Sequence, residues 1–439
     1  MCGIAAVSFS DTEGTLIMKS TLKTIISLVL SAMLILSAGC SSSQPEAISD
    51  EEMQPGEVIF ELDDTTESVI DDNVQNDDSS TKKSEFRLLF AGDYIIYDST
   101  YNYAAALANG SGYNFKPMVR LLRPFTERND LCYYNQETIL GGEKVGLSSY
   151  PCFCSPQQAG DAMVDLGFNL VSTATNHTFD AGEEGILESY KYWQKQDGVF
   201  MTGSFDSQSS RDEVHVLECN GVTYSMLNYT YGLNGFILPE GKEYLVNVWP
   251  CDFTSPETDS EYQAYKKQVK KDIDAVRDKV DFLMVCMHAG VEYSTNETDY
   301  QRDMAKYLAD CGVNLVIGTH PHVIEPAEYI GDTLVYYSLG NLFCAQMQDE
   351  YYNKVTSVMA ELTVKKVIEN GEIKIVLDDL NNELMYCYYN QATWTDYLIV
   401  PFSSPDIKKF LPEYKDVYEH YKEIFLQNDS SLPVAPCAK

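Results

Sequence analysis

The stretch NLVSTATNHTFDAGEEGILESYKYWQK, residues 169–195, sets the pattern for the fold. It opens with an apolar run, 169–174, that predicts a buried β-strand. A polar cluster with Asn176, His177 and Asp180 follows, and residues 183–195 then have helical spacing. A strand, a polar turn and a helix in succession are typical of an α/β protein whose polar turns share one edge of a sheet.

The same alternation continues on both sides of this stretch. We predict strands over 86–91, 131–134, 169–174, 222–229, 281–288, 314–320 and 333–339. We predict helices that open at Ser155-Pro156 or cover 183–195, 260–279, 298–311 and 406–425. Residues 355–367 and 372–380 should form a hairpin across Asn370-Gly371. These elements predict an α/β domain over 84–400, followed by a C-terminal helix and tail over 401–439.

Charge and cysteine content narrow the classes of function. The formal net charge is −35, from 66 acidic and 31 basic residues. Nucleic-acid binding needs a clustered basic surface, so we expect no nucleic-acid partner. None of the 12 cysteines forms a CxxC pair. We expect most of them to be buried as small hydrophobic residues, and the sequence assigns no disulfide.

The first 83 residues have the composition of an export and anchoring segment. From Met18 to Cys40 the chain reads MKSTLKTIISLVLSAMLILSAGC, with two lysines, an apolar core and small residues before the cysteine. This pattern predicts a lipoprotein signal peptide over 18–39, a lipidated Cys40 and an upstream extension over 1–17. The alternative, a spanning helix, is disfavoured because the apolar stretch is short. Residues 40–83 are acidic and polar, and predict a disordered tether. We therefore expect an extracytoplasmic protein anchored to the cell membrane.

Polar side chains gather where the predicted strands end. Asp93 follows 86–91, and Glu137 follows 131–134. Asn176, His177 and Asp180 follow 169–174, His288 ends 281–288, and His320 and His322 follow 314–317. Carboxyl ends of strands share one edge of an open α/β sheet, so these side chains should converge. We expect Pro321 to keep His320 extended, which would place both imidazoles of His320 and His322 on one side.

Carboxylate, imidazole and amide groups in one place indicate a metal site. The mixture suits Zn²⁺, Mn²⁺ or Fe, with one or two ions bound, rather than a thiolate-bound metal. The alternative is that each histidine caps a strand or satisfies a core hydrogen bond, and for His215 and His420 we favour it. For five strand ends together we favour the metal site.

Six motifs in this order carry a family resemblance: GD (92–93), NQET (135–138), TNHTFDAGEEGI (175–186), HAGVEY (288–293), GTHPHVIEP (318–326) and YSLGN (337–341). They resemble the motifs of the bacterial capsule-synthesis proteins of the CapA type, which include the poly-γ-glutamate synthesis protein PgsA. The resemblance covers roughly residues 86–345. It implies a calcineurin-like metallophosphoesterase fold, a four-layer α-β-β-α sandwich.

The resemblance also implies roles for single residues. It implies metal ligands at Asp93, Glu137, Asn176, His288, His320 and His322. It implies that His177 acts on the leaving group, that Asp180 holds His177 in orientation, and that Asn341 shapes the pocket. The chain departs from the aspartate–histidine start of ordinary metallophosphoesterases, because Tyr94 and Ile95 follow Asp93. Gln136, Thr175 and Ala289 are further departures from the family pattern.

The function that the resemblance implies is capsule or poly-γ-glutamate synthesis or processing. We expect a metal-dependent hydrolase or transferase that acts on a cell-surface polymer. The alternatives are a non-catalytic accessory factor that binds polymer or capsule synthase subunits, and a generic metallophosphoesterase. The acidic surface repels polyanions, which weighs against free poly-γ-glutamate as the substrate.

Overall fold

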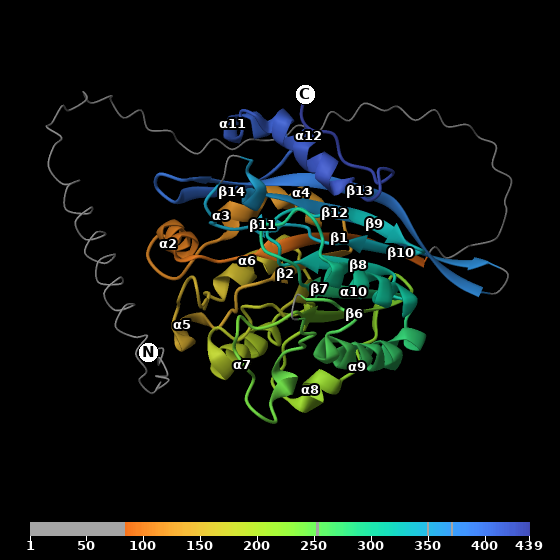
Figure 1. The fold of residues 1–439 in the computed structure, drawn as a ribbon. Helices are drawn as coiled ribbons and strands as arrows, with labels where there is room; N and C mark the ends of the chain where they lie inside the picture. The colour runs from red at the N-terminus through yellow and green to blue at the C-terminus, as the bar shows by residue number, and fades with distance from the viewer. Residues whose placement is uncertain (1–83, 252–253, 349–350, 370–371) are drawn as a thin grey trace, which may run out of the picture. The chain divides into compact units, whose positions relative to one another are not determined.

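The computed structural model describes residues 84–251, 254–348, 351–369 and 372–439 (Figure 1). The predicted extension (1–17), signal peptide (18–39), Cys40 and tether (40–83) lie outside these residues, as does the Asn370-Gly371 turn. Among the described helices, none is both long enough and apolar enough to cross a bilayer.

One sheet has eight strands. Its order is β14-β13-β12-β1-β2-β3-β4, and β11 also pairs with β1. The parallel part comprises β1 (Ser84–Tyr94), β2 (Leu131–Gln136), β3 (Leu170–Ser172), β4 (Phe200–Thr202) and β11 (Asn341–Phe343). An antiparallel extension comprises β12 (Thr356–Glu369), β13 (Glu372–Asn390) and β14 (Thr395–Pro401). The predicted hairpin is therefore present, with both strands longer than expected.

The other sheet has six strands in the order β5-β6-β7-β8-β10-β9. They are β5 (Leu217–Cys219), β6 (Val222–Thr230), β7 (Phe282–His288), β8 (Leu315–Thr319), β9 (Ala327–Ile330) and β10 (Thr333–Tyr336). Strands β6, β7, β8 and β10 are parallel, so their carboxyl ends share one edge. Each of the seven apolar runs that we predicted as strands overlaps a strand of one of the two sheets.

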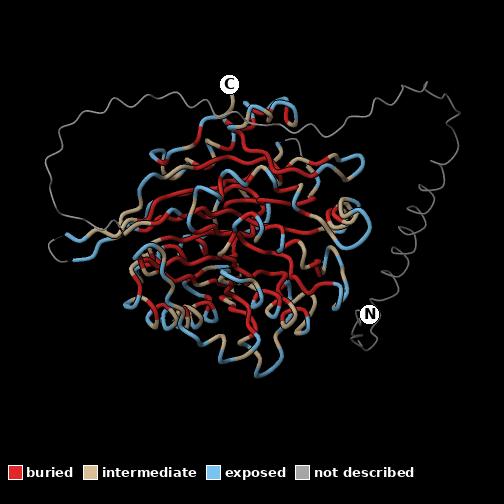
Figure 2. Tube along the Cα trace, turned by 180° about the vertical axis from the view of Figure 1, so that it is seen from behind, coloured by how far each residue is buried: buried red, intermediate tan, exposed pale blue. Residues whose placement is uncertain are grey.

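The main core lies between the two sheets. Alternate residues of β7 face it, and Phe282 packs against Phe86 of β1 with ring centroids 5.9 Å apart. Phe90 of β1 meets Tyr336 of β10 in the same way, at 5.0 Å. The intervening residues of β7, such as Leu283 and Val285, belong to a second cluster on the outer face. Figure 2 shows this interior as the run of buried trace through the middle of the domain.

Helices cover the outer faces of both sheets. Buried side chains of α9 (Ser260–Val276) and α10 (Asp299–Asp310) pack on the outer face of the six-stranded sheet. On the other sheet, α3 (Lys116–Val119), α4 (Arg123–Thr126), α6 (Gln158–Leu166) and α7 (Gly182–Trp193) join the cluster that contains β1 and β2. The architecture is thus the expected four-layer α-β-β-α sandwich (Figure 1).

The shorter elements complete the description. The remaining α-helices are α2 (Asp98–Leu107), α5 (Gly142–Val145), α8 (Gln208–Asp212), α11 (Ile407–Phe410) and α12 (Tyr414–Phe425). Four 3₁₀ turns cover Arg120–Leu122, Glu243–Leu245, Arg277–Lys279 and Asn353–Val355.

Two predicted helices differ from the structure. Helix α6 begins at Gln158 rather than at Ser155, whose hydroxyl donates to Thr138 Oγ1 (2.9 Å) instead of capping the helix. The single helix predicted over 406–425 is two helices, because Leu411 is extended. Pro412 follows it, and the residue before a proline is disfavoured in helical conformation. Within α12, Tyr414, Tyr418 and Tyr421 are buried in the core.

Candidate metal centre

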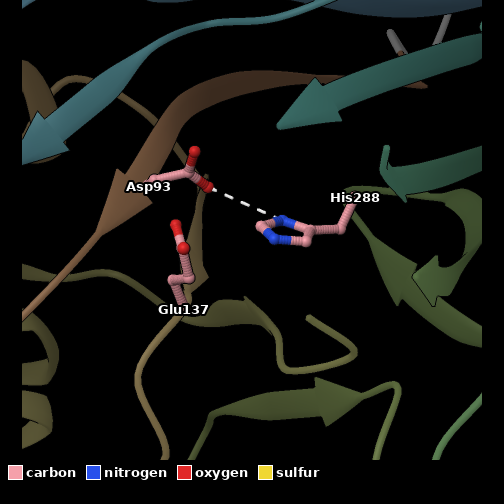
Figure 3. Close-up of side chains that lie close together, drawn as sticks. All are labelled: Asp93, Glu137 and His288. Carbon is pink, nitrogen blue, oxygen red and sulfur yellow. Dashed lines mark ion pairs between the residues drawn. The ribbon is translucent and has the colours of Figure 1, made fainter. Parts of the chain in front are cut away.

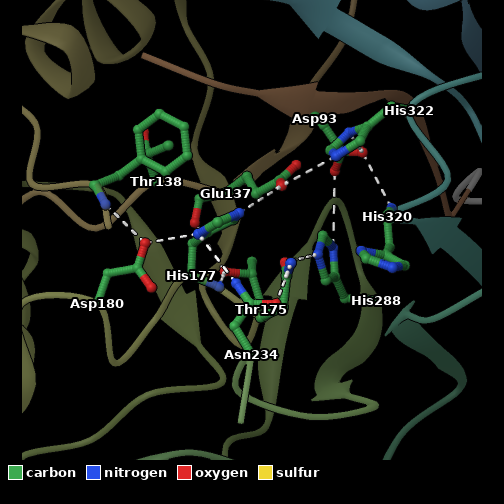
Figure 4. Close-up of polar contacts among 12 residues, drawn as sticks. Asp93, Glu137, Thr138, Thr175, His177, Asp180, Asn234, His288, His320 and His322 are labelled. Carbon is green, nitrogen blue, oxygen red and sulfur yellow. Dashed lines mark hydrogen bonds and ion pairs between the residues drawn. The ribbon is translucent and has the colours of Figure 1, made fainter. Parts of the chain in front are cut away.

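The structure brings all the predicted site residues together at the carboxyl ends of five strands (Figure 4). Asp93 is the residue before the last one of β1, and Glu137 directly follows β2. Asn176 and His177 follow β3, His288 ends β7, and His320 and His322 follow β8. All of these side chains are buried. The ring centroids of His288 and His320 are 4.9 Å apart, within reach of one metal cluster.

Two glycines allow the strand ends to approach each other so closely. A Cβ atom on Gly92 would lie 1.9 Å from the Gly340 carbonyl oxygen, next to the hydrogen bond from Asp93 N to that oxygen (3.0 Å). A Cβ atom on Gly318 would lie 1.9 Å from the Tyr337 carbonyl oxygen. Only glycine fits these close backbone contacts, which set the positions of Asp93 and of the histidines after β8.

Asp93 lies between two histidines. Its Oδ1 is 3.8 Å from His288 Nδ1, and its Oδ2 is 3.7 Å from His322 Nδ1. One ligand atom each from Asp93, Glu137 and His288 lie within 4.8 Å of one another (Figure 3). Asn135 Nδ2 donates to Asp93 Oδ1 (2.7 Å), and His320 N donates to Oδ2 (3.0 Å). These two donors fix the carboxylate plane.

Glu137 is a buried carboxylate whose oxygens have no hydrogen-bond partner among the described residues. The surrounding groups are His322 Nε2 at 3.7 Å and His177 Nε2 at 3.9 Å. Burial, and next the charge of Asp93, raise the pKa of Glu137 well above its ordinary value. Two buried carboxylates beside each other cost free energy unless a cation compensates them. The unpaired oxygens of Glu137 therefore fit a bound metal ion.

Two histidines of the cluster, His288 and His320, are held in the form that binds metal. Burial, and next the neighbouring histidines, lower the pKa of His288 and of His320 well below the ordinary range. Both imidazoles are thus neutral at pH 7, and a neutral imidazole nitrogen is a metal ligand. His320 Nδ1 has no hydrogen-bond partner in the part of the chain that the structure describes. His288 Nε2 lies 2.9 Å from Asn176 Oδ1, so the donor atoms of these two predicted ligands are adjacent.

The backbone at the two histidines after β8 differs from the prediction. His320 has φ of 100° and His322 has φ of 63°, so neither is extended. The turn that these angles form brings the amide of His320 onto Asp93, and this contact overrides the preference that Pro321 imposes. Non-glycine residues at positive φ cost about 1–3 kcal/mol each and cluster at functional sites. Asn341 Oδ1, 3.0 Å from His322 Nδ1, fixes the second ring.

His177 and Asp180 form a pair beside the cluster. His177 Nδ1 lies 2.6 Å from Asp180 Oδ2, which also accepts from Phe153 N (2.7 Å). The edge of the His177 ring also meets Phe153 at 4.8 Å between centroids. The other ring nitrogen, Nε2, faces Glu137 (Figure 4). Asp180 therefore positions His177, and His177 presents one nitrogen to the site.

Several residues of the site were not assigned from the sequence. Asn135 lies in the NQET motif, whose spacing already pointed at this strand end. Thr319 Oγ1, 2.9 Å from His288 Nδ1, sits in the GTHPH motif. Asn234, whose Oδ1 accepts from Asn176 Nδ2 (3.1 Å), comes from the segment after β6, where no pattern signals it. Tyr293, which closes the HAGVEY motif, lies with its ring centroid 5.8 Å from that of His322.

Comparison with known proteins identifies the family of the chain. Residues 87–346 match the family described as bacterial capsule synthesis protein PGA_cap. The chain belongs to this family. Its fold is of the calcineurin-like metallophosphoesterase type. Its buried Asp93, Glu137 and His288 form a group that could hold a metal ion.

Two curated relatives share this part of the PGA_cap chain. The "PGA biosynthesis protein CapA" of Bacillus subtilis (strain 168) is 30% identical over 178 residues, covering 40% of this chain and 43% of the relative. The "Capsule biosynthesis protein CapA" of Bacillus anthracis is 25% identical over 181 residues, covering 41% of each chain. The chain thus spans less than half the length of these relatives. A solved structure, "GAP50 the anchor in the inner membrane complex of Plasmodium", matches with a TM-score of 0.33 and 10% identity over 81% of this chain and 98% of that chain.

Proposed function

We propose that this CapA-type protein is a metal-dependent hydrolase or transferase that acts on a cell-surface polymer during capsule synthesis. The observation that carries the proposal is the buried Glu137 carboxylate, unpaired beside Asp93 and three histidines. Such a cluster is costly without a cation, and structural needs of the fold do not account for it. The names of the two CapA relatives, which refer to PGA and to capsule biosynthesis, support the choice of process.

The residues form one connected donor cluster. His322 lies within ion-pair distance of both Asp93 and Glu137, and His288 lies within that distance of Asp93. Asn176 and His320 lie beside His288. Oxygen and imidazole donors of this kind suit Zn²⁺, Mn²⁺ or Fe, as one or two ions. A bound divalent ion would polarise an ester, amide or phosphoryl oxygen and stabilise the negative charge that develops on it.

His177 supplies the proton chemistry. With Nδ1 held by Asp180, the proton on that nitrogen stays in the hydrogen bond, and Nε2 is left to exchange a proton with the substrate. Because Nε2 faces Glu137, the exchange occurs at the edge of the donor cluster. His177 is therefore the general acid that protonates the leaving group, and Asp180 is its positioning residue.

Anchoring and partners are part of the same proposal. The lipoprotein signal over 18–39 and Cys40 would hold the domain outside the cell membrane, with the segment 40–83 as its tether. There it would meet the polymer and the capsule synthase subunits. One observation favours the non-catalytic alternative. The chain lacks the histidine that follows the aspartate at the start of ordinary metallophosphoesterases, and the buried, apolar Ile95 after β1 adds no ligand to the cluster.

Metal analysis and turnover with matched histidine variants test the proposal. We expect the purified protein to hold stoichiometric metal and to hydrolyse poly-γ-glutamate or another wall polymer. His288→Ala should lose both properties. His420→Ala, an exposed histidine on α12, should keep both. A metal-free protein that binds polymer equally well with and without His288 would contradict catalysis and favour the accessory role, and turnover of a generic phosphodiester alone would favour an ordinary phosphoesterase.

A further inference from the structure

A pocket of about 950 Å³ opens beside the metal centre. Its wall comes from the start of α2, the loop before Pro151, the segment after β7, the segment after β11 and the β13–β14 turn. Ligand sites of drug-sized or sugar-sized molecules have about 300–1,000 Å³. The pocket is therefore large enough to hold part of a polymer chain.

Tyr293 joins this pocket to the metal centre. Its ring lines the pocket and lies 5.8 Å from the ring of His322, while its backbone amide donates to the Pro321 carbonyl oxygen (2.8 Å). Tyr97 makes a second connection, because its ring meets Phe153 at 5.2 Å, and Phe153 in turn meets His177. A molecule seated in the pocket is thus separated from His322 by the Tyr293 ring, and from His177 by the rings of Tyr97 and Phe153.

The pocket is lined by aromatic side chains from separate parts of the chain: Tyr97, Tyr103, Tyr150, Tyr293 and Trp394. Tyr150 has 72% of its surface exposed, so its ring is accessible to a ligand in the pocket. Trp394 stacks on Tyr389 with a centroid distance of 5.3 Å and an angle of 17°, so the plane of its ring is fixed. Flat, fixed aromatic faces pack well against the C–H faces of sugar rings.

The polar lining is neutral apart from two groups. Asn102, Gln346 and several hydroxyls supply donors and acceptors, and Asp98 adds one negative charge. Lys354 is the single cation of the lining; its Nζ lies over the Tyr293 ring at 4.5 Å, and it forms no ion pair with any described residue. A lining with one cation, Lys354, and one acid, Asp98, is suited to a ligand that carries few charges. A γ-glutamyl chain, with a carboxylate on every unit, would leave most of its charges uncompensated.

We propose that this pocket binds sugar units of a cell-surface glycan that carries at most one acidic group on the segment bound. The inference rests on the proposed function, since it names the polymer that reaches the metal centre. Tyr150 and Trp394 stack on the sugar rings, amide and hydroxyl groups of the lining pair with the sugar hydroxyls, and Lys354 pairs with the acidic group.

Fluorescence of the full-length protein can report binding directly. The chain has three tryptophans, and Trp193 and Trp249 are buried, so Trp394 alone reports on the pocket. The probes are an N-acetylglucosamine tetramer, which is neutral, the N-acetylglucosamine–N-acetylmuramic acid disaccharide, which has one carboxylate, and poly-γ-glutamate. We expect both sugars to change the Trp394 signal saturably. Calorimetry gives the affinities for variants that lack the tryptophan.

The variants separate the contributions of stacking and charge. Tyr150→Ala and Trp394→Ala should weaken both sugars about tenfold or more, as loss of an aromatic anchor does. Lys354→Gln should weaken only the acidic disaccharide. Tyr329→Ala, an exposed tyrosine on β9, should leave binding unchanged. His288→Ala should also retain binding, because it removes only a metal ligand; loss of turnover with binding retained tests the proposed function separately.

Two results would overturn the inference. One is that neither sugar binds, while poly-γ-glutamate binds and is lost in the Tyr150 and Trp394 variants; the proposed function would then stand with another substrate. The other is sugar binding that these variants leave unchanged, which would place the sugar outside the pocket.

Discussion

Replacing Glu137 by glutamine separates the stability of the folded chain from its affinity for metal. In the metal-free protein, the carboxylate oxygens of Glu137 have no hydrogen-bond partner, and Asp93 repels their charge. Glutamine keeps the shape and removes the charge, so the metal-free variant should melt at or above the temperature of the parent protein. With metal the order should reverse, because glutamine lacks the charge that a divalent ion requires.

The size of the reversal follows from linkage. An ion at a hundred times its Kd adds about 2.7 kcal/mol to the free energy of unfolding. For a folded unit of about 350 residues, the unfolding entropy corresponds to about 0.75 kcal/mol per degree, so the melting temperature rises by about 4 °C. If the variant binds a hundredfold more weakly, the same ion concentration adds about 0.4 kcal/mol, or about half a degree.

Thermal melts in a chelator and with Mn²⁺ or Zn²⁺ measure both quantities. Glu325→Gln is the matched control, because Glu325 is also buried with one unpaired oxygen but pairs with Gln301 rather than with the histidines. Its metal-induced shift should equal that of the parent protein. If Glu137→Gln gains the full 4 °C with metal, Glu137 is not a ligand and the site as described is wrong.

Three further outcomes follow from single contacts. Asp180→Asn should lower kcat by about 10²–10⁴-fold with little change in metal content, measured by steady-state kinetics and metal analysis, since it weakens the hydrogen bonds that Asp180 makes with His177 and with Phe153 N, and neither partner is a proposed metal ligand. Burial raises the pKa of Glu383 from 4.5 to about 7, so the folded state holds a proton that the unfolded chain releases; stability is full below pH 4.5 and falls as the pH rises through 7. Glu383→Gln should abolish this fall and be more stable at pH 8 by up to about 3 kcal/mol in urea unfolding. Gly318→Ala should destabilise the protein by more than about 3 kcal/mol in the same assay, because its Cβ would meet the Tyr337 carbonyl oxygen; an unchanged midpoint would contradict the close contact.

Strand positions could be predicted because burial on both faces leaves a simple signal. Runs such as 282–287 are apolar throughout, as strands between two layers are. Element ends were less predictable, since they depend on local partners. The sequence around Ser155 is typical of a helix cap, but the Ser155 hydroxyl donates a hydrogen bond to Thr138 Oγ1 instead. No local sequence pattern predicts that contact.

The site could be predicted as a set of strand ends, but its geometry could not. Polar residues after buried strands indicated which side chains converge. The positive φ of His320 and His322 arises from a tertiary hydrogen bond to Asp93, more than 200 residues earlier. Asn234 comes from a segment without a motif and meets Asn176 only because the chain folds back. Such contacts depend on the assembled fold rather than on local pattern.

The central position of β1 has a consequence for how the protein is made. Leu88 of β1 pairs with Leu131 on one side and with Leu362 on the other, about 270 residues later. Synthesis therefore has to pass residue 362 before Leu88 has a partner on both sides. Folding governed by such distant contacts is slow, and the apolar face of β1 stays uncovered during synthesis. We expect the nascent chain to depend on holding chaperones, and C-terminally truncated forms to aggregate rather than fold in part.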